Sequence, residues 1–116
     1  MKITSISGYS CYVKDLEKTA KFYQELGFLS GKSEEDRKVF RINWFSVEFI
    51  LDKEKAGKGE GVLFGMTVDN AEETYKELVA KGLKPESEPK VRPDGKNGFI
   101  LKDPDGYQLL FFTKKY

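Results

Sequence analysis

Residues 13–28 read VKDLEKTAKFYQELGF, and residues 68–83 read VDNAEETYKELVAKGL. Shifting the chain by 55 residues superimposes these two segments. Five of the sixteen positions are then identical, namely those of Val13, Glu17, Thr19, Lys21 and Gly27. In both segments an Asp or Asn suited to cap a helix precedes a Glu in the first turn, and a Gly follows the last turn. The pattern predicts two copies of one structural unit.

Each copy is expected to be a β-α-β-β-β unit. The helices should begin after Asp15 and Asn70 and end at Gly27 and Gly82, with apolar residues at helical spacing between them. The turn Asp103-Pro104-Asp105-Gly106 has Pro and Gly where a tight turn favours them. Strands are predicted at residues 6–13, 28–32, 37–44, 45–51, 62–68, 84–91, 98–102 and 107–113.

The length of 116 residues and the mass of 13.3 kDa fit one domain spanning residues 1–116. Within it we expect a first module at residues 1–52 and a second at residues 62–116. Residues 53–61, rich in Gly and Lys, are expected to be the linker.

The composition excludes several classes of protein. Hydrophobic residues at 39% and aromatic residues at 14% exclude a disordered chain, and the net charge of +1 gives no overall attraction to nucleic acid or anionic lipid. The single cysteine, Cys11, cannot form an internal disulfide, which suits a reducing cytoplasm. No signal peptide or long apolar run is seen, so we expect a cytoplasmic protein that binds neither nucleic acid nor membrane.

The chain has no histidine. Serine or cysteine nucleophiles activated by histidine, imidazole bases and histidine-ligated metals are therefore excluded, and one cysteine cannot build a thiolate zinc site. What remains is a carboxylate-based oxygen site, a Lys or Tyr base, or binding without catalysis.

Three stretches carry a resemblance to a known family: residues 12–18, YVKDLEK; residues 22–28, FYQELGF; and residues 101–107, LKDPDGY. Together with the repeat, they resemble the vicinal oxygen chelate superfamily, which includes glyoxalases, bleomycin resistance proteins and extradiol dioxygenases. The resemblance implies an α+β fold in which two βαβββ modules form a curved mixed sheet around a cup. It also implies a homodimer that completes the cup.

Enzymes of that family hold a divalent metal in the cup. The resemblance places the metal-ligand positions at Gly8, Leu63, Leu110 and Glu48. Glycine has no side chain and leucine is an alkyl group, so Glu48 is the one remaining ligand, whereas oxygen sites for hard cations use several. We therefore expect no metal and no other cofactor.

Because side chains alternate along a strand, one face of the sheet should pack on the helices and the other should line the cup. The cup-facing set combines rings with a few polar groups, as small-molecule sites usually do. Ligand contacts are expected from Ser10, Tyr12, Arg41, Trp44, Glu48, Thr67, Gln108 and Phe112. Arg41 is a candidate partner for Glu48. The pattern leaves the directions of Arg41 and Trp44 open, and Trp44 and Phe112 also suit a core or a dimer interface.

Three functions follow. The favoured one is a metal-independent dimeric protein that captures a partly aromatic or apolar small molecule, an antibiotic being one candidate. The second is a glyoxalase-like lyase or isomerase with Glu48 as base and Tyr12 as acid. The third is a non-catalytic interaction module with a filled cup. Lys53, Lys55 and Lys58 are within reach of an anionic ligand, but a charged loop is the simpler interpretation.

Overall fold

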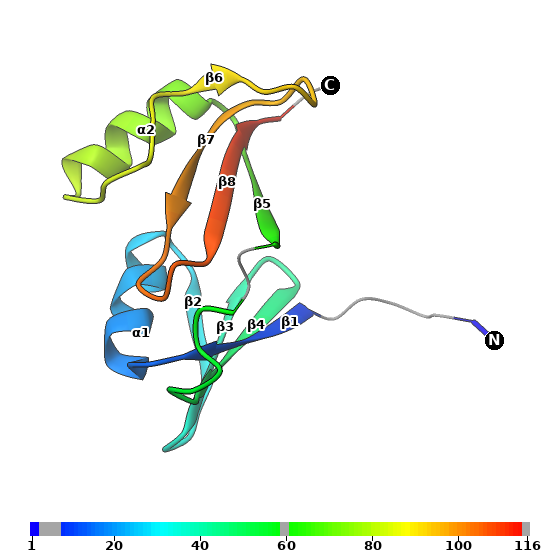
Figure 1. Cartoon of the computed structure of the whole chain (residues 1–116), viewed down its shortest axis with the longest axis vertical. Coiled ribbons are helices and arrows are strands. Elements are labelled where there is room, and N and C mark those ends of the chain that lie inside the picture. The colour runs from blue at the N-terminus through cyan, green and yellow to red at the C-terminus, as the bar shows by residue number, and fades with distance from the viewer. Residues whose placement is uncertain (3–7, 59–60, 115–116) are drawn as a thin grey trace. The chain divides into compact units, whose positions relative to one another are not determined.

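Each half of the chain folds as the β-α-β-β-β unit that the repeat predicts (Figure 1). The computed structural model describes residues 1–2, 8–58 and 61–114. The first unit, Met1–Lys58, contains β1 (Gly8–Val13), α1 (Leu16–Glu25), β2 (Leu29–Ser33), β3 (Arg37–Ile42) and β4 (Phe45–Leu51). The second unit, Gly59–Tyr116, contains β5 (Leu63–Val68), α2 (Ala71–Ala80), β6 (Lys90–Val91), β7 (Asn97–Lys102) and β8 (Gln108–Thr113). The predicted α+β class and its two modules are confirmed.

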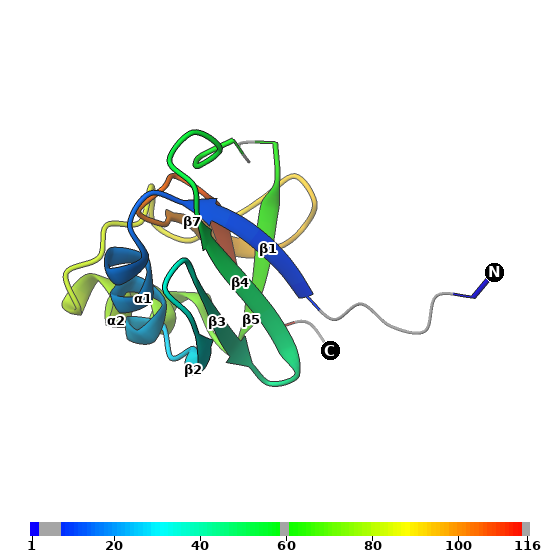
Figure 2. The ribbon, with the colours of Figure 1, turned by 90° about the horizontal axis from the view of Figure 1, so that it is seen from below.

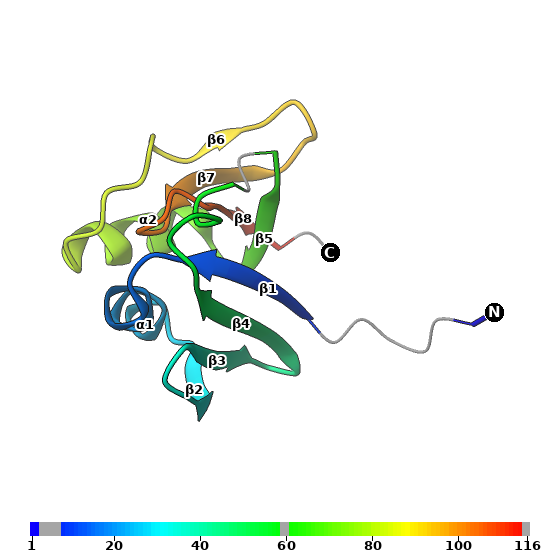
Figure 3. The same cartoon turned by 60° about the horizontal axis from the view of Figure 1, so that its bottom comes forward.

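Each unit has one four-stranded mixed sheet. The first sheet has the order β1-β4-β3-β2, in which β1 runs parallel to β4 and the other pairs are antiparallel (Figures 2 and 3). The second sheet has the order β5-β8-β7-β6, with β5 parallel to β8. The two units therefore share one topology, which the repeat implies.

The helix of each unit begins and ends as the sequence predicts. The Asp15 carboxylate accepts a hydrogen bond from the Lys18 amide at 3.1 Å, and Asn70 does the same for the Glu73 amide at 3.0 Å. Gly27 has a φ of 95°, which allows the amide of the next residue, Phe28, to donate to the Tyr23 carbonyl at 3.1 Å. This is the Schellman closure, and α2 repeats it at Gly82.

One face of each sheet packs on the helix of its own unit and forms the core. In the first unit Tyr23 of α1 is fully buried, and its ring lies 4.6 Å from that of Phe49 on β4. In the second unit the ring of Tyr75 on α2 meets that of Phe99 on β7 edge-to-face at 5.6 Å. We call the opposite side of each sheet its open face.

Two of the predicted strands are shorter in the structure by two residues or more. The strand predicted at residues 84–91 is reduced to Lys90–Val91, because Pro85 and Pro89 have no amide hydrogen for a sheet. The strand predicted at 37–44 ends at Ile42, because Asn43 adopts a φ of 54° and turns the chain. Residues 6 and 7 of the strand predicted at 6–13 lie outside the described residues.

The boundary between the units, at residues 58 and 59, falls inside the segment predicted as the linker. The start of that segment nevertheless belongs to the first unit. The Asp52 amide donates to the Val13 carbonyl at 3.0 Å, and the Asp52 carboxylate accepts from the amides of Glu54 and Lys55 at 3.1 Å. Residues 52–55 are thus held as an Asx turn against the end of β1.

The predicted turn between β7 and β8 is confirmed. Asp103 is 5% exposed, and its carboxylate accepts from the amides of Asp105 and Tyr107, each at 2.9 Å. Gly106 completes the turn with a φ of 89°. None of the helices among the described residues is long and apolar enough to cross a membrane.

The Thr19 hydroxyl gives a test of the core. It is buried and has no hydrogen-bond partner, and an unsatisfied buried polar group costs about 1–3 kcal/mol. Thr19→Val keeps the shape of the side chain and should raise the free energy of unfolding by ~1 kcal/mol, measured by urea denaturation. Thr19→Ser keeps the hydroxyl and removes a methyl group, so it should lower the stability. Destabilisation by Thr19→Val would show that the hydroxyl is bonded after all.

Candidate functional site

The open face of the first sheet carries the polar residues that alternation predicts there. Cys11 and Val13 are buried on the helix side of β1, whereas Ser10 and Tyr12 point the other way and are exposed. The register places Ser10 directly beside Glu48 of β4. A hollow of about 240 Å³ opens at this point, and it is lined by Gly8, Tyr9, Ser10, Val39, Ser46 and Glu48.

Glu48 is held from two sides. The Ser10 hydroxyl donates to one carboxylate oxygen at 3.2 Å, and the guanidinium of Arg37 lies 3.6 Å from the other. The expected partner, Arg41, is not the one that forms the ion pair. Val39 lies directly opposite Glu48, so Arg37 and Arg41 are its two diagonal neighbours on β3, and the pair forms on the Arg37 side.

Arg37 also binds the hairpin that precedes it. Its Nε donates to the Asp36 carboxylate at 3.3 Å, and this hydrogen bond is the main reason why the pKa of Arg37 is raised. The negative charges of Asp36 and Glu48 raise the pKa further. Arg37 therefore joins the Glu48 carboxylate to the β2–β3 hairpin.

Tyr12 lies on the same open face beneath a lysine. The ammonium of Lys55 sits 5.0 Å from the centre of the Tyr12 ring, and the Asx turn at Asp52 holds the backbone of Lys55 in place. Such a cation–π contact contributes about 0.5–1 kcal/mol at an exposed site. Tyr12 is 37% exposed, so its ring remains accessible.

The open face of the second sheet carries Thr67, Gln108 and Phe112. Thr67 and Phe112 are register partners on β5 and β8, and Gln108 pairs with Leu63 at the other end of β5. The Phe112 ring lies over Gly65, where an added Cβ would meet the ring edge at 3.3 Å. The ammonium of Lys96 is 5.4 Å from the centre of the same ring. Each open face thus presents an aromatic ring beneath a lysine.

Trp44 does not line the hollow. It lies at the turn between β3 and β4 and is 93% exposed. Its neighbours Ile42 and Phe45 are each 38% exposed, and the Phe45 ring contacts Tyr9 at 5.5 Å. Together Ile42, Trp44 and Phe45 form an apolar patch, which we call the hairpin tip.

The positions that the resemblance assigns to metal ligands do not fit a metal ion. Leu63 and Leu110 offer alkyl groups, and no group of three potential ligands that could hold a metal occurs among the described residues. Gly8 is constrained further by its backbone, because a Cβ built there would overlap the carbonyl oxygen of Ser46. In this arrangement of β1 and β4, position 8 has no room for a coordinating side chain.

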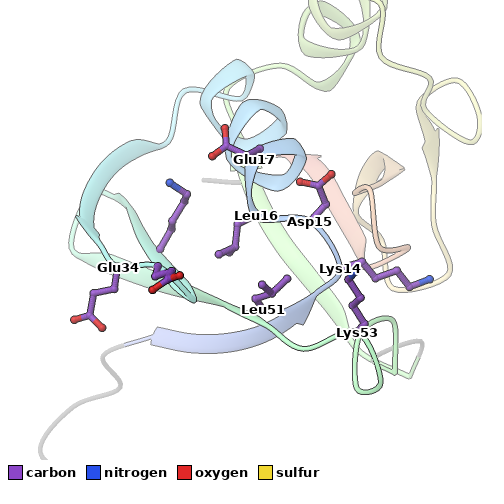
Figure 4. Close-up of a pocket in the computed structure, with 9 residues that line it drawn as sticks. Lys14, Asp15, Leu16, Glu17, Glu34, Leu51 and Lys53 are labelled. Carbon is purple, nitrogen blue, oxygen red and sulfur yellow. The ribbon is translucent and has the colours of Figure 1, made fainter.

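A larger hollow lies on the helix side of the first unit (Figure 4). It measures about 530 Å³ and is lined by Lys14, Asp15, Leu16, Glu17, Glu34, Glu35, Lys38, Leu51 and Lys53. Leu16 and Leu51 lie in its middle, and charged side chains of both signs surround them (Figure 4). The smaller hollow contains Ser10 and Glu48, two of the residues predicted to contact a ligand, and is therefore the candidate site.

Sequence reasoning missed Arg37, Gly65 and Lys96, and it interpreted Lys55 as part of a charged loop. Strand alternation alone places Arg37 on the same face as Arg41, so that signal was available. Gly65 stands opposite ring-bearing β8 on the open face, where a glycine indicates close approach of another group. Nothing in the pattern places the loop residues Lys55 and Lys96 over rings.

Comparison with protein-family models identifies one superfamily. The model of the Glyoxalase/Bleomycin resistance protein/Dioxygenase superfamily matches residues 5–111. No curated protein matches the chain in sequence.

Solved structures share the fold at low sequence identity. A hypothetical protein from S. aureus is 25% identical, with 98% of this chain and 96% of that chain covered and a TM-score of 0.79. A bleomycin-binding protein, solved in complex with bleomycin, is 20% identical, with 97% and 100% covered and a TM-score of 0.78. Lactoylglutathione lyase from Agrobacterium tumefaciens is 15% identical, with 97% and 96% covered and a TM-score of 0.77.

The constraint at Gly8 can be tested by adding one methyl group. Gly8→Ala should lower the free energy of unfolding by more than the ~1–3 kcal/mol typical of overpacking, because backbone atoms must separate. Gly65→Ala is the matched control and should cost less, since only the Phe112 side chain has to move. Urea denaturation measures both. A Gly8→Ala protein as stable as the parent would mean that β1 and β4 are not this close.

Proposed function

This chain belongs to the Glyoxalase/Bleomycin resistance protein/Dioxygenase superfamily, and on that premise we propose that it is a metal-independent binding protein for a small, partly aromatic or apolar molecule. The proposal rests on two features that occur together where β1 lies beside β4. Position 8 leaves no room for a metal-binding side chain, yet the adjoining hollow keeps Ser10 and Glu48 facing outward. A site that has hydrogen-bonding side chains but no metal ligands is suited to binding a small molecule without catalysis.

Each open face carries candidate ligand contacts. Tyr12 supplies an exposed ring and Phe112 a half-buried one, and hydrogen-bonding groups that orient a ligand come from Ser10, Glu48, Thr67 and Gln108. Arg41 is exposed on the same face as Glu48 and adds a positive charge at its rim. An antibiotic is one candidate ligand, because a protein of this fold is known in complex with bleomycin. Bleomycin itself is cationic, and the charge balance of this chain does not favour it.

We further propose that the protein is a cytoplasmic homodimer in which the partner covers the hairpin tip. Trp44, Ile42 and Phe45 expose apolar surface next to one another, and β1 and β5 each lie at the edge of a sheet. Apolar patches and open edges of this kind favour association. This assigns Trp44 to the dimer interface, which its sequence position also allowed.

Thermal unfolding tests the binding proposal directly. A ligand at a hundred times its Kd adds about 2.7 kcal/mol to the stability of the folded protein, which raises the Tm measurably. We expect no shift with EDTA or with Ni, Zn, Mn or Fe(II), and a shift with at least one compound from a panel of planar antibiotics and aromatic metabolites.

Two variants localise the effect. Glu48→Gln should weaken binding of the active compound by about tenfold, as loss of a charge-assisted contact does, while Glu72→Gln on the exposed side of α2 should leave it unchanged. A saturable metal shift that disappears in Glu48→Ala would contradict metal independence. It would restore the lyase or isomerase alternative, with Glu48 as base.

The dimer is tested by light scattering at micromolar concentration. The mass should be twice the 13.3 kDa of one chain, and Trp44→Lys should shift it toward the monomer by removing the largest exposed ring at the hairpin tip. Lys21→Met, on the exposed side of α1, is the control. A monomeric mass for the parent protein would reject the dimer.

A further inference from the structure

The open-face positions of the strands hold more basic than acidic residues, although the chain as a whole is nearly neutral. Along β1, β3 and β4 the open-face positions hold Arg37 and Arg41 against one acidic residue, Glu48. Along the described strands of the second sheet they hold Lys90 and Lys102 and no acidic residue. The net charge of +1 therefore conceals an excess of positive charge on the faces that we assign to the ligand.

Carboxylates beyond the strands neutralise part of this charge. Arg37 is paired with Asp36 and lies 3.9 Å from Glu34, and Lys102 is paired with Glu86 at 3.0 Å. In contrast, no ion pair is formed by Arg41, Lys55 or Lys90 within the described part of the chain. These three groups have no carboxylate partner there, whereas Lys96 has the Asp94 carboxylate 3.7 Å away.

The two lysines over rings point to where that charge would sit. Lys55 is placed over Tyr12, and Lys96 over Phe112, by loops of different structure in different units. An ammonium above a ring puts a positive charge beside an apolar surface. A molecule that joins an aromatic group to an anionic group would match both features at once, since its rings pack on the face while its anion meets the lysine.

We propose that the ligand class is an organic anion, in which a carboxylate, sulfonate or phosphate is joined to an aromatic or apolar body. Lys55 on the open face of the first unit and Lys96 on that of the second each receive the anionic group of a molecule bound to that face. This inference rests on the proposed binding function and narrows its ligand. It also assigns a part to Asp94, whose carboxylate lies 3.7 Å from the Lys96 ammonium and so competes with the ligand for it.

A pair of fluorescent probes tests the charge requirement. Anilinonaphthalene sulfonate and phenyl naphthylamine share their rings and differ by the sulfonate. We expect the native protein to bind the sulfonate probe about tenfold more tightly, as one charge-assisted contact provides, and added salt to reduce this preference. Thermal unfolding in parallel shows that each probe binds the folded protein.

Matched variants test the lysines. Replacing both Lys55 and Lys96 by Met should abolish the preference for the sulfonate and leave binding of the neutral probe unchanged. The control replaces Lys21 and Lys76 by Met, which makes the same change of charge on α1 and α2. Asp94→Asn keeps an acceptor for the Lys96 amide, which donates to that side chain at 2.9 Å, and should tighten binding of the sulfonate.

The outcomes separate this inference from the binding function itself. Equal affinity for the two probes, or a sulfonate preference that survives in the Lys55→Met, Lys96→Met protein, would overturn the organic-anion proposal and leave the binding function standing. Failure of both probes to bind the folded protein would overturn the two together.

Discussion

The register of two parallel strand pairs, β1 with β4 and β5 with β8, determines which side chains form the cores and which lie on the open faces. Val47 and Phe49 of β4 and Leu109 and Phe111 of β8 must face the helices to form the cores. Because side chains alternate, that requirement alone turns Glu48 and Phe112 to the open faces, and a shift of one residue would exchange the two sets. The candidate ligand groups are thus positioned by the packing behind them.

Features that depend on a few neighbouring residues, such as helix caps and strand alternation, could be predicted from the sequence. Contacts made by long side chains across strands or from loops could not. Asp15 and Gly27 signal a helix start and stop within one turn, and alternation predicts the facing of Ser10 and Glu48. The choice of Arg37 over Arg41 depends on which diagonal across β3 and β4 a long side chain bridges, and the residue pattern is the same for both. The shortening of β6 could have been predicted, since Pro85 and Pro89 both lie inside the strand expected at residues 84–91.

Net charge is a poor guide to a protein whose faces differ. The first turn of each helix holds acidic residues, Glu17 in α1 and Glu72 and Glu73 in α2, where the helix dipole favours negative charge. The open faces carry arginine and lysine instead. The net charge of +1 is therefore a sum over parts of the chain that differ in charge, and it does not describe the open faces.

The closeness of Gly8 to the Ser46 carbonyl also bears on the history of the chain. A substitution that put a histidine at position 8 would have to force β1 away from β4 before it could offer a ligand. A coordinating residue could be accommodated there only together with other substitutions that move β1 and β4 apart. Selection would meet this barrier in one direction only, because loss of a side chain needs no such preparation. The packing at Gly8 therefore makes this position easier to empty of a side chain than to fill with one.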